Sequence, residues 1–479
     1  MVWRIITHEW RNLRADRSLW LLAALFTLII GYGIYNGRAW AQSRQELAGK
    51  LAPKTQSFIK EFKMRLAQGL PPPPNSGVRD LSSPYSVSTQ YWDVLLPPTP
   101  LAALSVGQSD LYPGATQARM WSTPDKLFAQ SEPQNPVNLQ AGRFDLAFVV
   151  IYLFPLLILA LGYNLLSAEK EEGTLALLLS QSASLSQVVI GKAIARVVLL
   201  SGFLIIVSLI GISIAGARFA GPVEAAQLSL WIAVVMTYGL FWQTLSVLVN
   251  LWNRGSATNA LILAGVWLAL VIVVPSLVNS ATALLYPIPP RAELIIADRD
   301  AEPNVKRDGQ RVLSRFYEDH PELRPAATEA EVGVFRRMLL TVFLANQRAY
   351  EPLARRYDIQ LQRQQALVDY LRFLTPAAAT HEPINDLSGS GFMRYRRFRA
   401  QVNGFIERQR EFFVPKVMRD AKMTVADYDA LPVFRYEEEP LAEMGRRVMK
   451  SLAGLIIWVG LCAAAAAVKL RGYSVAGTA

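Results

Sequence analysis

The chain has 479 residues, of which 52% are hydrophobic, and its formal net charge is +11 at pH 7. The apolar residues are gathered into long runs, which excludes an ordinary soluble globular protein. The basic residues are spread over loops and mixed with acidic ones, which argues against nucleic-acid binding. The single cysteine, Cys462, excludes a disulfide framework or a cysteine metal site within one chain.

Six apolar runs approach the ~20 residues that a helix needs to cross a bilayer. We expect transmembrane helices at residues 19–36, 144–166, 193–215, 228–250, 258–280 and 451–468. The remaining residues include two polar stretches, 37–143 and 281–450, that are long enough to fold. The sequence therefore predicts an all-α polytopic membrane protein, with a mainly helical periplasmic domain built from these two long loops.

The N-terminal stretch, residues 1–18, contains four arginines and precedes the first span. Its apolar residues fall on one helical face, at Trp3, Ile6, Trp10 and Leu13. This pattern predicts an interfacial helix, and the arginines place the N-terminus in the cytoplasm. Residues 39–41 resemble a signal-peptide cleavage site, but the preceding apolar run is longer than a signal core, so we expect a retained span.

Six spans return the C-terminus, with its tail 469–479, to the cytoplasm. Basic residues then flank the spans on the cytoplasmic side, at Lys170, Lys192, Arg254, Lys469 and Arg471. The two long loops lie on the other side, because long domains cross a membrane largely regardless of charge, and we expect them to pack together there. The prediction is a multi-pass protein of the bacterial inner membrane.

In the first loop, we expect helix to continue from the first span to Gly69 and to break at Pro71–Pro74, with turns around one short helix beyond. In the second loop, residues 328–373 and Phe392–Asp420 are predicted helices, the first with a kink at Pro352.

The stretch between those helices, Thr375–Gly391, contains Pro376, Pro383 and a Ser-Gly-Ser-Gly run. These residues predict a loop, with His381 at its surface. The arginine cluster at 394–399 is interpreted as a solvated helix face rather than an anion site.

The segment 167–192 joins the second and third spans on the cytoplasmic side. It begins with four charged residues: Glu169, Lys170, Glu171 and Glu172. It breaks at Gly173, and Thr174 is the expected N-cap of a short amphipathic helix. The helical spacing rests on Leu175, Leu178 and Leu179. Ser184 and Gln187 then form a capping box before the third span. Such a segment offers a surface to a partner.

The chain lacks the motifs of an energy-converting enzyme. The Gly-Lys pair at 191–192 is not followed by Ser or Thr, so there is no phosphate-binding loop, and no catalytic set appears among three histidines. We expect no enzyme activity, metal or cofactor in this chain. Asp145 and Arg196, near the edges, are the only Asp, Glu, Lys or Arg residues within the spans, which argues against ion-coupled transport. Energy would then arrive from another subunit, through the segment 167–192.

Two prolines inside spans, Pro155 and Pro275, are possible hinges, although proline is common in membrane helices. Three polar residues in the spans are expected to hydrogen-bond between helices: Asn164, Gln243 and Asn259.

The run from Glu169 to Leu175, followed by Leu177–Ser180 and the Gly-Lys pair, resembles the cytoplasmic signature of ABC type-2 permeases, the membrane subunits of ATP-driven exporters. Three other stretches resemble a bacterial subgroup with two large extracytoplasmic insertions of unknown function: Pro100–Pro113, Gly142–Asp145 and Thr375–Tyr395.

The resemblance implies a half-transporter. Two six-span permeases, identical or paired with a sister, would sit on two ATP-binding subunits that carry ATP and magnesium. It implies that the acids of the segment meet basic residues of the ATPase and that the Leu175–Ser180 helix fills its groove. The implied coupling residues are Glu169, Lys170, Glu171, Glu172, Gly173, Thr174, Leu175, Leu178, Leu179 and Ser180.

Three functions are compatible with these features. The first is export of an amphipathic or lipid-like substrate through the bilayer. The alternative is a mechanotransmission complex, in which ATP hydrolysis moves the outer domains to act on a periplasmic or outer-membrane partner without a substrate path. The third is a membrane-anchored receptor or scaffold that needs no ATPase.

Overall fold

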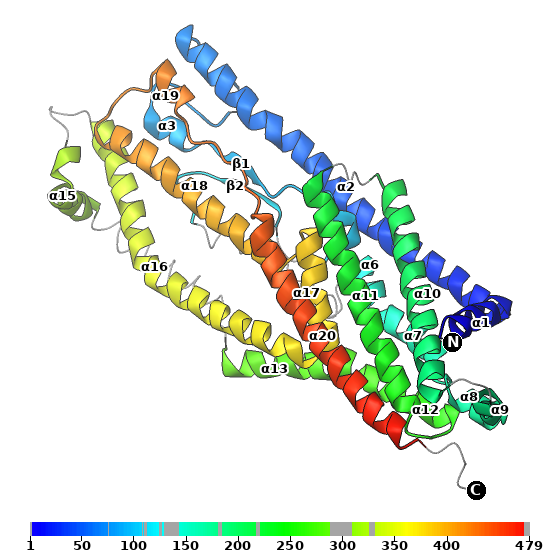
Figure 1. The fold of residues 1–479 in the computed structure, drawn as a ribbon. Helices are drawn as coiled ribbons and strands as arrows, with labels where there is room; N and C mark the ends of the chain where they lie inside the picture. The colour runs from blue at the N-terminus through cyan, green and yellow to red at the C-terminus, as the bar shows by residue number, and fades with distance from the viewer. Residues whose placement is uncertain are drawn as a thin grey trace.

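The computed structural model describes residues 2–74, 76–107, 109, 113–123, 127–128, 143–180, 184–216, 221–287, 309–324 and 331–473, the side chains of 176–178, 331 and 332 excepted. In these ranges most residues are helical, and six helices are long and apolar enough to cross a membrane (Figure 1). The protein is thus an all-α polytopic membrane protein, with the number of candidate spans that the sequence predicted.

The candidate spans include two interrupted helices. The spans are α2 (Arg17–Ala67), α6–η2–α7 (Leu146–Phe148, Val149–Leu153, Phe154–Gly162), α10 (Leu185–Ile214), α11 (Pro222–Asn250), α12–η3–α13 (Ser256–Leu268, Ala269–Val273, Val274–Leu285) and α20 (Leu441–Arg471). In both interrupted spans the middle element, η2 or η3, is a π-helical turn.

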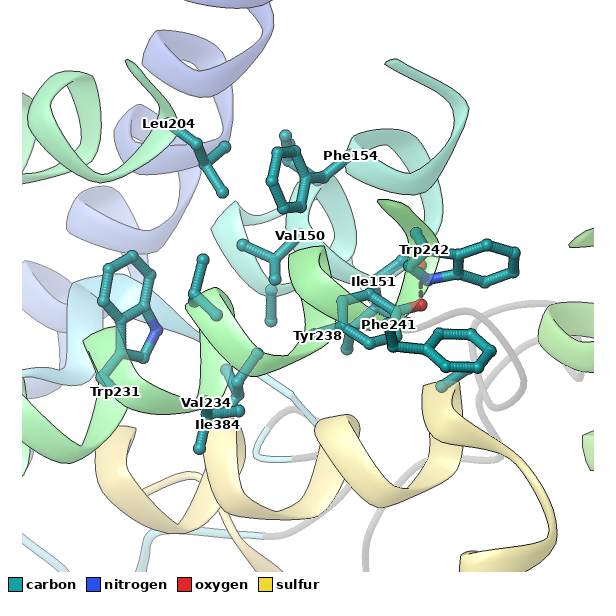
Figure 2. Close-up of a cluster of buried hydrophobic side chains, with 14 of the residues drawn as sticks. Val150, Ile151, Phe154, Leu204, Trp231, Val234, Tyr238, Phe241, Trp242 and Ile384 are labelled. Carbon is teal, nitrogen blue, oxygen red and sulfur yellow. Dashed lines mark hydrogen bonds between the residues drawn. The ribbon is translucent and has the colours of Figure 1, made fainter. Parts of the chain in front are cut away.

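Span α11 lies at the centre of the membrane bundle, where it packs against α7, α10 and α20. Its large side chains Trp231, Tyr238, Phe241 and Trp242 are fully buried. Figure 2 shows them among side chains from neighbouring helices, namely Val150, Ile151, Phe154, Leu204 and Ile384. Because these aromatic groups fill the interior, α11 is the element around which the other spans pack.

A short helix, α1 (Val2–Ala15), occupies the predicted N-terminal stretch and packs against α10. Trp3 and Trp10 are exposed on it, whereas Leu13 is buried. The next helix, α2, is continuous for 51 residues, or about 75 Å, so one helix serves as both span and extension. In Figure 1, α1 and the end of α20 lie at one end of the bundle, and α2 reaches away toward the other.

The remaining elements form the polar lobe, which comprises the described parts of 37–143 and 281–440. They are α3 (Pro84–Ser88), β1 (Trp92–Leu95), η1 (Ala102–Leu104), β2 (Ala115–Ala118), α15 (Gly309–Asp319), η4 (Pro321–Leu323), α16 (Glu331–Leu371), η5 (Arg372–Leu374), α17 (Pro376–Ser388), α18 (Phe392–Met418) and α19 (Val425–Asp429). The strands β1 and β2 pair antiparallel, a feature that the sequence analysis did not predict.

The two long loops pack together in this lobe. Phe62 of α2 shares a buried cluster with Phe413 and Met418 of α18. The buried Tyr428 hydroxyl donates to the carbonyl of Leu81 at 2.8 Å. Contacts between residues more than 300 positions apart make the lobe one folded unit rather than two separate insertions.

The predicted loop at Thr375–Gly391 is wrong, because α17 occupies it. The residues that suggested a loop are helix caps: Thr375 accepts a hydrogen bond from the backbone of Ala378, Pro376 lies in the first turn, and Gly389 ends the helix at φ +75°. His381 therefore lies on a helix and is partly buried, not on a loop surface.

The interpretation of 394–399 as a solvated face is also wrong for one residue. Arg394 is buried and forms an ion pair with Glu438, with Nε donating to Oε2 at 3.0 Å. Its Nη2 also donates to the carbonyl of Pro97 at 2.7 Å. Arg394 therefore ties α18 to both long loops, whereas Arg396 is exposed as expected.

Candidate functional site

The segment after the second span forms two short helices, α8 (Ser167–Glu171) and α9 (Thr174–Ser180), which we call the elbow. They meet at Gly173, whose φ of +73° lies in the left-handed region that favours glycine. Thr174 is the first residue of α9, one position later than an N-cap, and its hydroxyl donates to the carbonyl of Glu169 at 3.2 Å. The break and restart of the helix therefore occur where the sequence indicated.

Two cations on one face of α10 hold the elbow and α1 against the bundle. Lys192 Nζ lies 2.5 Å from Glu169 Oε1 and donates to the carbonyl of Leu165 at 3.1 Å. One turn later, Arg196 Nε donates to Glu9 Oε1 at 2.8 Å, and its Nη1 donates to the carbonyl of Leu161. Both cations thus satisfy carbonyls at the end of the second span while pairing with an acid.

Side chains from two further spans bind the non-helical turn 163–166. Asn250, at the end of α11, accepts from the backbone of Leu166 at 3.1 Å and donates to the carbonyl of Gly162 at 2.9 Å. Asn259 of α12 donates to the carbonyl of Tyr163 at 3.3 Å. Backbone outside a helix needs other hydrogen-bond partners, and with Lys192 of α10 three spans supply them. The prediction of an interhelical hydrogen bond is confirmed for Asn259.

Two charged residues at the start of the elbow, Lys170 and Glu171, form hydrogen bonds within the chain. The Glu171 carboxylate accepts from the backbone of Ser256 at 2.7 Å and from its hydroxyl at 3.0 Å, so it caps the N-terminus of α12. Lys170 Nζ donates to Asn253 Oδ1 at 2.7 Å, and Asn253 has a φ of +61°. These contacts tie the elbow to the 251–257 loop.

The remaining elbow residues divide into buried and exposed sets. Leu175 is buried, and Leu179 is half-buried. Glu172, Thr174 and Ser180 are exposed, whereas the side chain of Leu178 lies outside the described residues. The sequence analysis assigned the same role, contact with the ATPase, to Glu169, Glu171 and Glu172. The structure distinguishes them, because the first two have partners within the chain and Glu172 points to solvent.

At the other end of the bundle, α17 leaves the polar lobe and packs among the candidate spans. It packs against α11 and α20 and also contacts both π turns, η2 and η3. Ile384 and Leu387 are fully buried in the same cluster as the spans, and Figure 2 shows Ile384 near Val234 of α11. We call α17 together with η2 and η3 the joint.

Both candidate hinge prolines lie directly beyond a π turn. Pro155 follows η2 and Pro275 follows η3, each as the second residue of the next α-helix. Pro155 has no N–H to donate to Ile151, four residues earlier, and the Tyr238 hydroxyl donates to that carbonyl instead, at 2.9 Å. Trp267 donates to the next carbonyl, of Tyr152, at 3.2 Å. The irregular turn is thus stabilised from two other spans.

Besides its apolar packing, α17 has ionic contacts with α20. Arg447 of α20 bonds Asp386 at 2.9 Å and Glu439 at 2.7 Å. Hydrogen bonding from Arg447 lowers the pKa of Glu439, whereas burial raises the pKa of Asp386.

A second polar chain links α17 to the first loop. The Ser105 hydroxyl donates to Asn385 Oδ1 at 2.7 Å, and Asn385 Nδ2 lies 3.2 Å from His381 Nδ1. Asp145, at the start of the second span, accepts from the backbone of Val106 at 2.7 Å. Burial lowers the pKa of the His381 imidazole. These groups therefore connect both loops to the second span through direct hydrogen bonds.

Sequence reasoning missed several of these residues. Asn250 and Glu9 had no assigned role, and α17 was taken for a loop. The available signals were an asparagine at the end of one span, α11, and two cations four residues apart near the start of another, α10. Gln243, in contrast, has no hydrogen-bond partner among the described residues, although it is buried. Asn164 contributes its backbone carbonyl, which accepts from Ala168 at 3.3 Å.

No group of three or more His, Cys, Asp or Glu side chains that could hold a metal ion occurs in the described part of the chain. A family model described as "Domain of unknown function (DUF3526)" matches residues 291–437, which include α15 to α19. A comparison with curated proteins found no match. The chain is therefore similar to this domain family over the second long loop, and that range contains α17 of the joint.

Proposed function

We propose that this chain is the permease subunit of an ATP-driven ABC type-2 exporter in the bacterial inner membrane. Both termini and the elbow lie in the cytoplasm, and the polar lobe lies in the periplasm. Two copies of a separate subunit bind ATP and magnesium, and a second permease, identical or a sister, completes the complex. The substrate is amphipathic or lipid-like.

The observation that carries this proposal is the attachment of the elbow. Its inner side is bonded to α10, to α12 and to the 251–257 loop, whereas Glu172 faces outward. A displacement of the elbow is therefore passed to the ends of several spans together. In Figure 1 the elbow, α1 and the end of α20 share one end of the bundle. Lys170 lies in α8, and Lys469 and Arg471 lie in the last turn of α20, and basic residues beside the spans support a cytoplasmic assignment of this end.

The test is charge reversal on the outward face. Glu172→Lys should reduce substrate-stimulated ATP turnover of the assembled complex at least several-fold while leaving the thermal midpoint of the chain unchanged. Glu46→Lys, an exposed charge reversal on the lobe part of α2, is the matched control and should leave turnover intact. A functional chain that never copurifies with an ATP-binding subunit would refute the proposal.

The second candidate is mechanotransmission, and the joint favours it. Because α17 contacts both π turns and four spans, movement of the spans is passed to the polar lobe even without a substrate path. Reconstituted complexes distinguish the two functions. ATP-dependent movement of an amphipathic fluorophore across the vesicle membrane supports export, whereas ATP turnover that never moves a solute supports mechanotransmission.

A further inference from the structure

A cleft of about 340 Å³ lies beside the joint, between the two interrupted spans and the polar lobe. On the membrane side it is lined by Ile151 and Tyr152 of η2 and by Val271 of η3. On the lobe side, α16 and α17 form the wall, and the start of α18 closes one edge. This volume falls within the range of small-molecule sites, which is ~300–1,000 Å³.

The walls of the cleft combine apolar and charged groups. Apolar side chains come from six elements and include Ile151, Val271, Pro275, Val368, Ala378 and Met393. The charged lining residues are Asp369, Arg372 and Glu382. An apolar wall with a few polar groups is the usual character of a site for an amphipathic molecule.

The charges in the lining do not balance. Among the described residues that line the cleft, Arg372 is the one Lys or Arg side chain, and it forms an ion pair with Glu382. Asp369 lies on the same wall, and its Oδ1 accepts a hydrogen bond from Gln365 at 3.3 Å. With His381 kept neutral by burial, one carboxylate charge exceeds the cationic charge of the lining. The cleft therefore favours a ligand with one positive charge.

Aromatic rings add to the same preference. Tyr152 and Phe392 line the cleft, and Tyr152 stacks on Phe148 with ring centroids 4.7 Å apart. Organic cations are attracted electrostatically to the faces of aromatic rings. A carboxylate and aromatic rings in one apolar cleft recognise a hydrophobic cation better than an anion or a sugar.

We propose that this cleft binds an organic monocation that carries bulky apolar groups, with its charge near Asp369 and its apolar groups against the π turns. The export role of such a ligand rests on the proposed function, but binding to the cleft needs no ATPase. Residues of η2 and η3 and Pro275 line the same cleft, so binding of the ligand should also affect the packing of the joint.

The experiment uses two ions of the same shape and opposite charge, tetraphenylphosphonium and tetraphenylborate. Binding to the full chain in phosphatidylglycerol nanodiscs is measured by equilibrium dialysis, with empty nanodiscs as background. The phosphonium ion should bind saturably and the borate should not. Asp369→Asn should weaken phosphonium binding about tenfold, whereas Asp358→Asn, three turns earlier on α16, should not.

Two further variants distinguish loss of the binding site from misfolding of Asp369→Asn. Ala378→Phe fills the cleft without changing its charge and should abolish saturable binding, while Asp369→Glu should retain it. Adding phosphatidylcholine to the discs separates the sources of the cation: a lower phosphonium affinity assigns the site to a lipid headgroup, and an unchanged affinity assigns it to a free solute. Equal binding of both ions, or full binding by Asp369→Asn, would overturn the cleft site even if the ATPase associates.

Discussion

The elbow and the joint connect the same spans at opposite ends of the bundle, but by different chemistry. The elbow is held by ions and caps: Lys192 with Glu169, and Glu171 with the N-terminus of α12. The joint is held mainly by apolar packing of α17, with Ile384 and Leu387 fully buried among the spans. A polar attachment is directional, whereas apolar packing resists displacement in any direction.

The elbow and the joint therefore differ in what they leave accessible. The elbow uses Glu169 and Glu171 for its own attachment and exposes Glu172, the residue on which the proposed contact with an ATP-binding subunit depends. The joint exposes little of α17 and couples the two π turns to the polar lobe. Variants that weaken each attachment separately test whether the elbow is held by ionic contacts and the joint by apolar packing.

The largest effect is expected at the elbow. Lys192→Met leaves the Glu169 carboxylate and the Leu165 carbonyl without their cation in a site where the lysine side chain is only 9% exposed. Breaking a buried pair costs about 3–5 kcal/mol. The thermal midpoint of the purified chain should fall sharply. The double variant Lys192→Met/Glu169→Leu should recover most of the loss, and a double variant as unstable as the single one would show that the pair is not the cause.

At the joint, Ile384→Ala removes buried apolar volume from the centre of the bundle. A cavity of this kind costs about 2–4 kcal/mol. The control is Ile359→Ala on α16, where the side chain is 48% exposed and the expected change is below about 0.5 kcal/mol. Comparable midpoints for the two variants would mean that α17 is not held by packing.

The two regions were not equally accessible from sequence. At the elbow the signals were local: a charged run, Gly173, and the Ser184 capping box, which is confirmed with Gln187 N donating to Ser184 Oγ at 3.3 Å. Local caps leave a sequence signature because both partners lie within one turn. The same reasoning could not pair Glu171 with Ser256, because 85 residues separate them.

At the joint, the local sequence pattern led to a wrong prediction of a loop. Pro376 and Gly389 are turn residues by composition, yet they start and end α17, and the helix gains its stability from spans distant in the chain. The number of spans was predictable because a membrane imposes a long apolar run on each one. The insertion of a lobe helix among them depends on tertiary contacts that composition does not encode.

A smaller effect is expected from the bond between spans at η2. Tyr238→Phe removes the hydroxyl that donates to Ile151 and leaves a carbonyl without a donor in an apolar interior, at about 1–3 kcal/mol. Adding Pro155→Ala restores a backbone N–H near that carbonyl and should return part of the thermal midpoint. If the second change adds to the loss instead, the Tyr238 bond does not compensate for the proline.

The smallest effect is a pH dependence of the joint. Because Arg447 lowers the pKa of Glu439 below its ordinary 4.5, the ionised carboxylate stabilises the folded state above that value. This contribution is lost as the pH falls through the lower pKa of the folded chain. Thermal midpoints measured from pH 7 downward should therefore decrease less steeply for Glu439→Gln than for the parent protein.

Asp386, which contacts the same arginine, should respond to pH in the opposite direction. Burial raises its pKa, so its contribution to stability grows as the pH falls, opposite to that of Glu439. Asp386→Asn should therefore make the acid-side decrease steeper, while Glu439→Gln makes it shallower. Opposite changes of slope would locate the pH response in the contacts of Arg447 that tie α17 to α20, and slopes that shift in the same direction would place it elsewhere in the lobe.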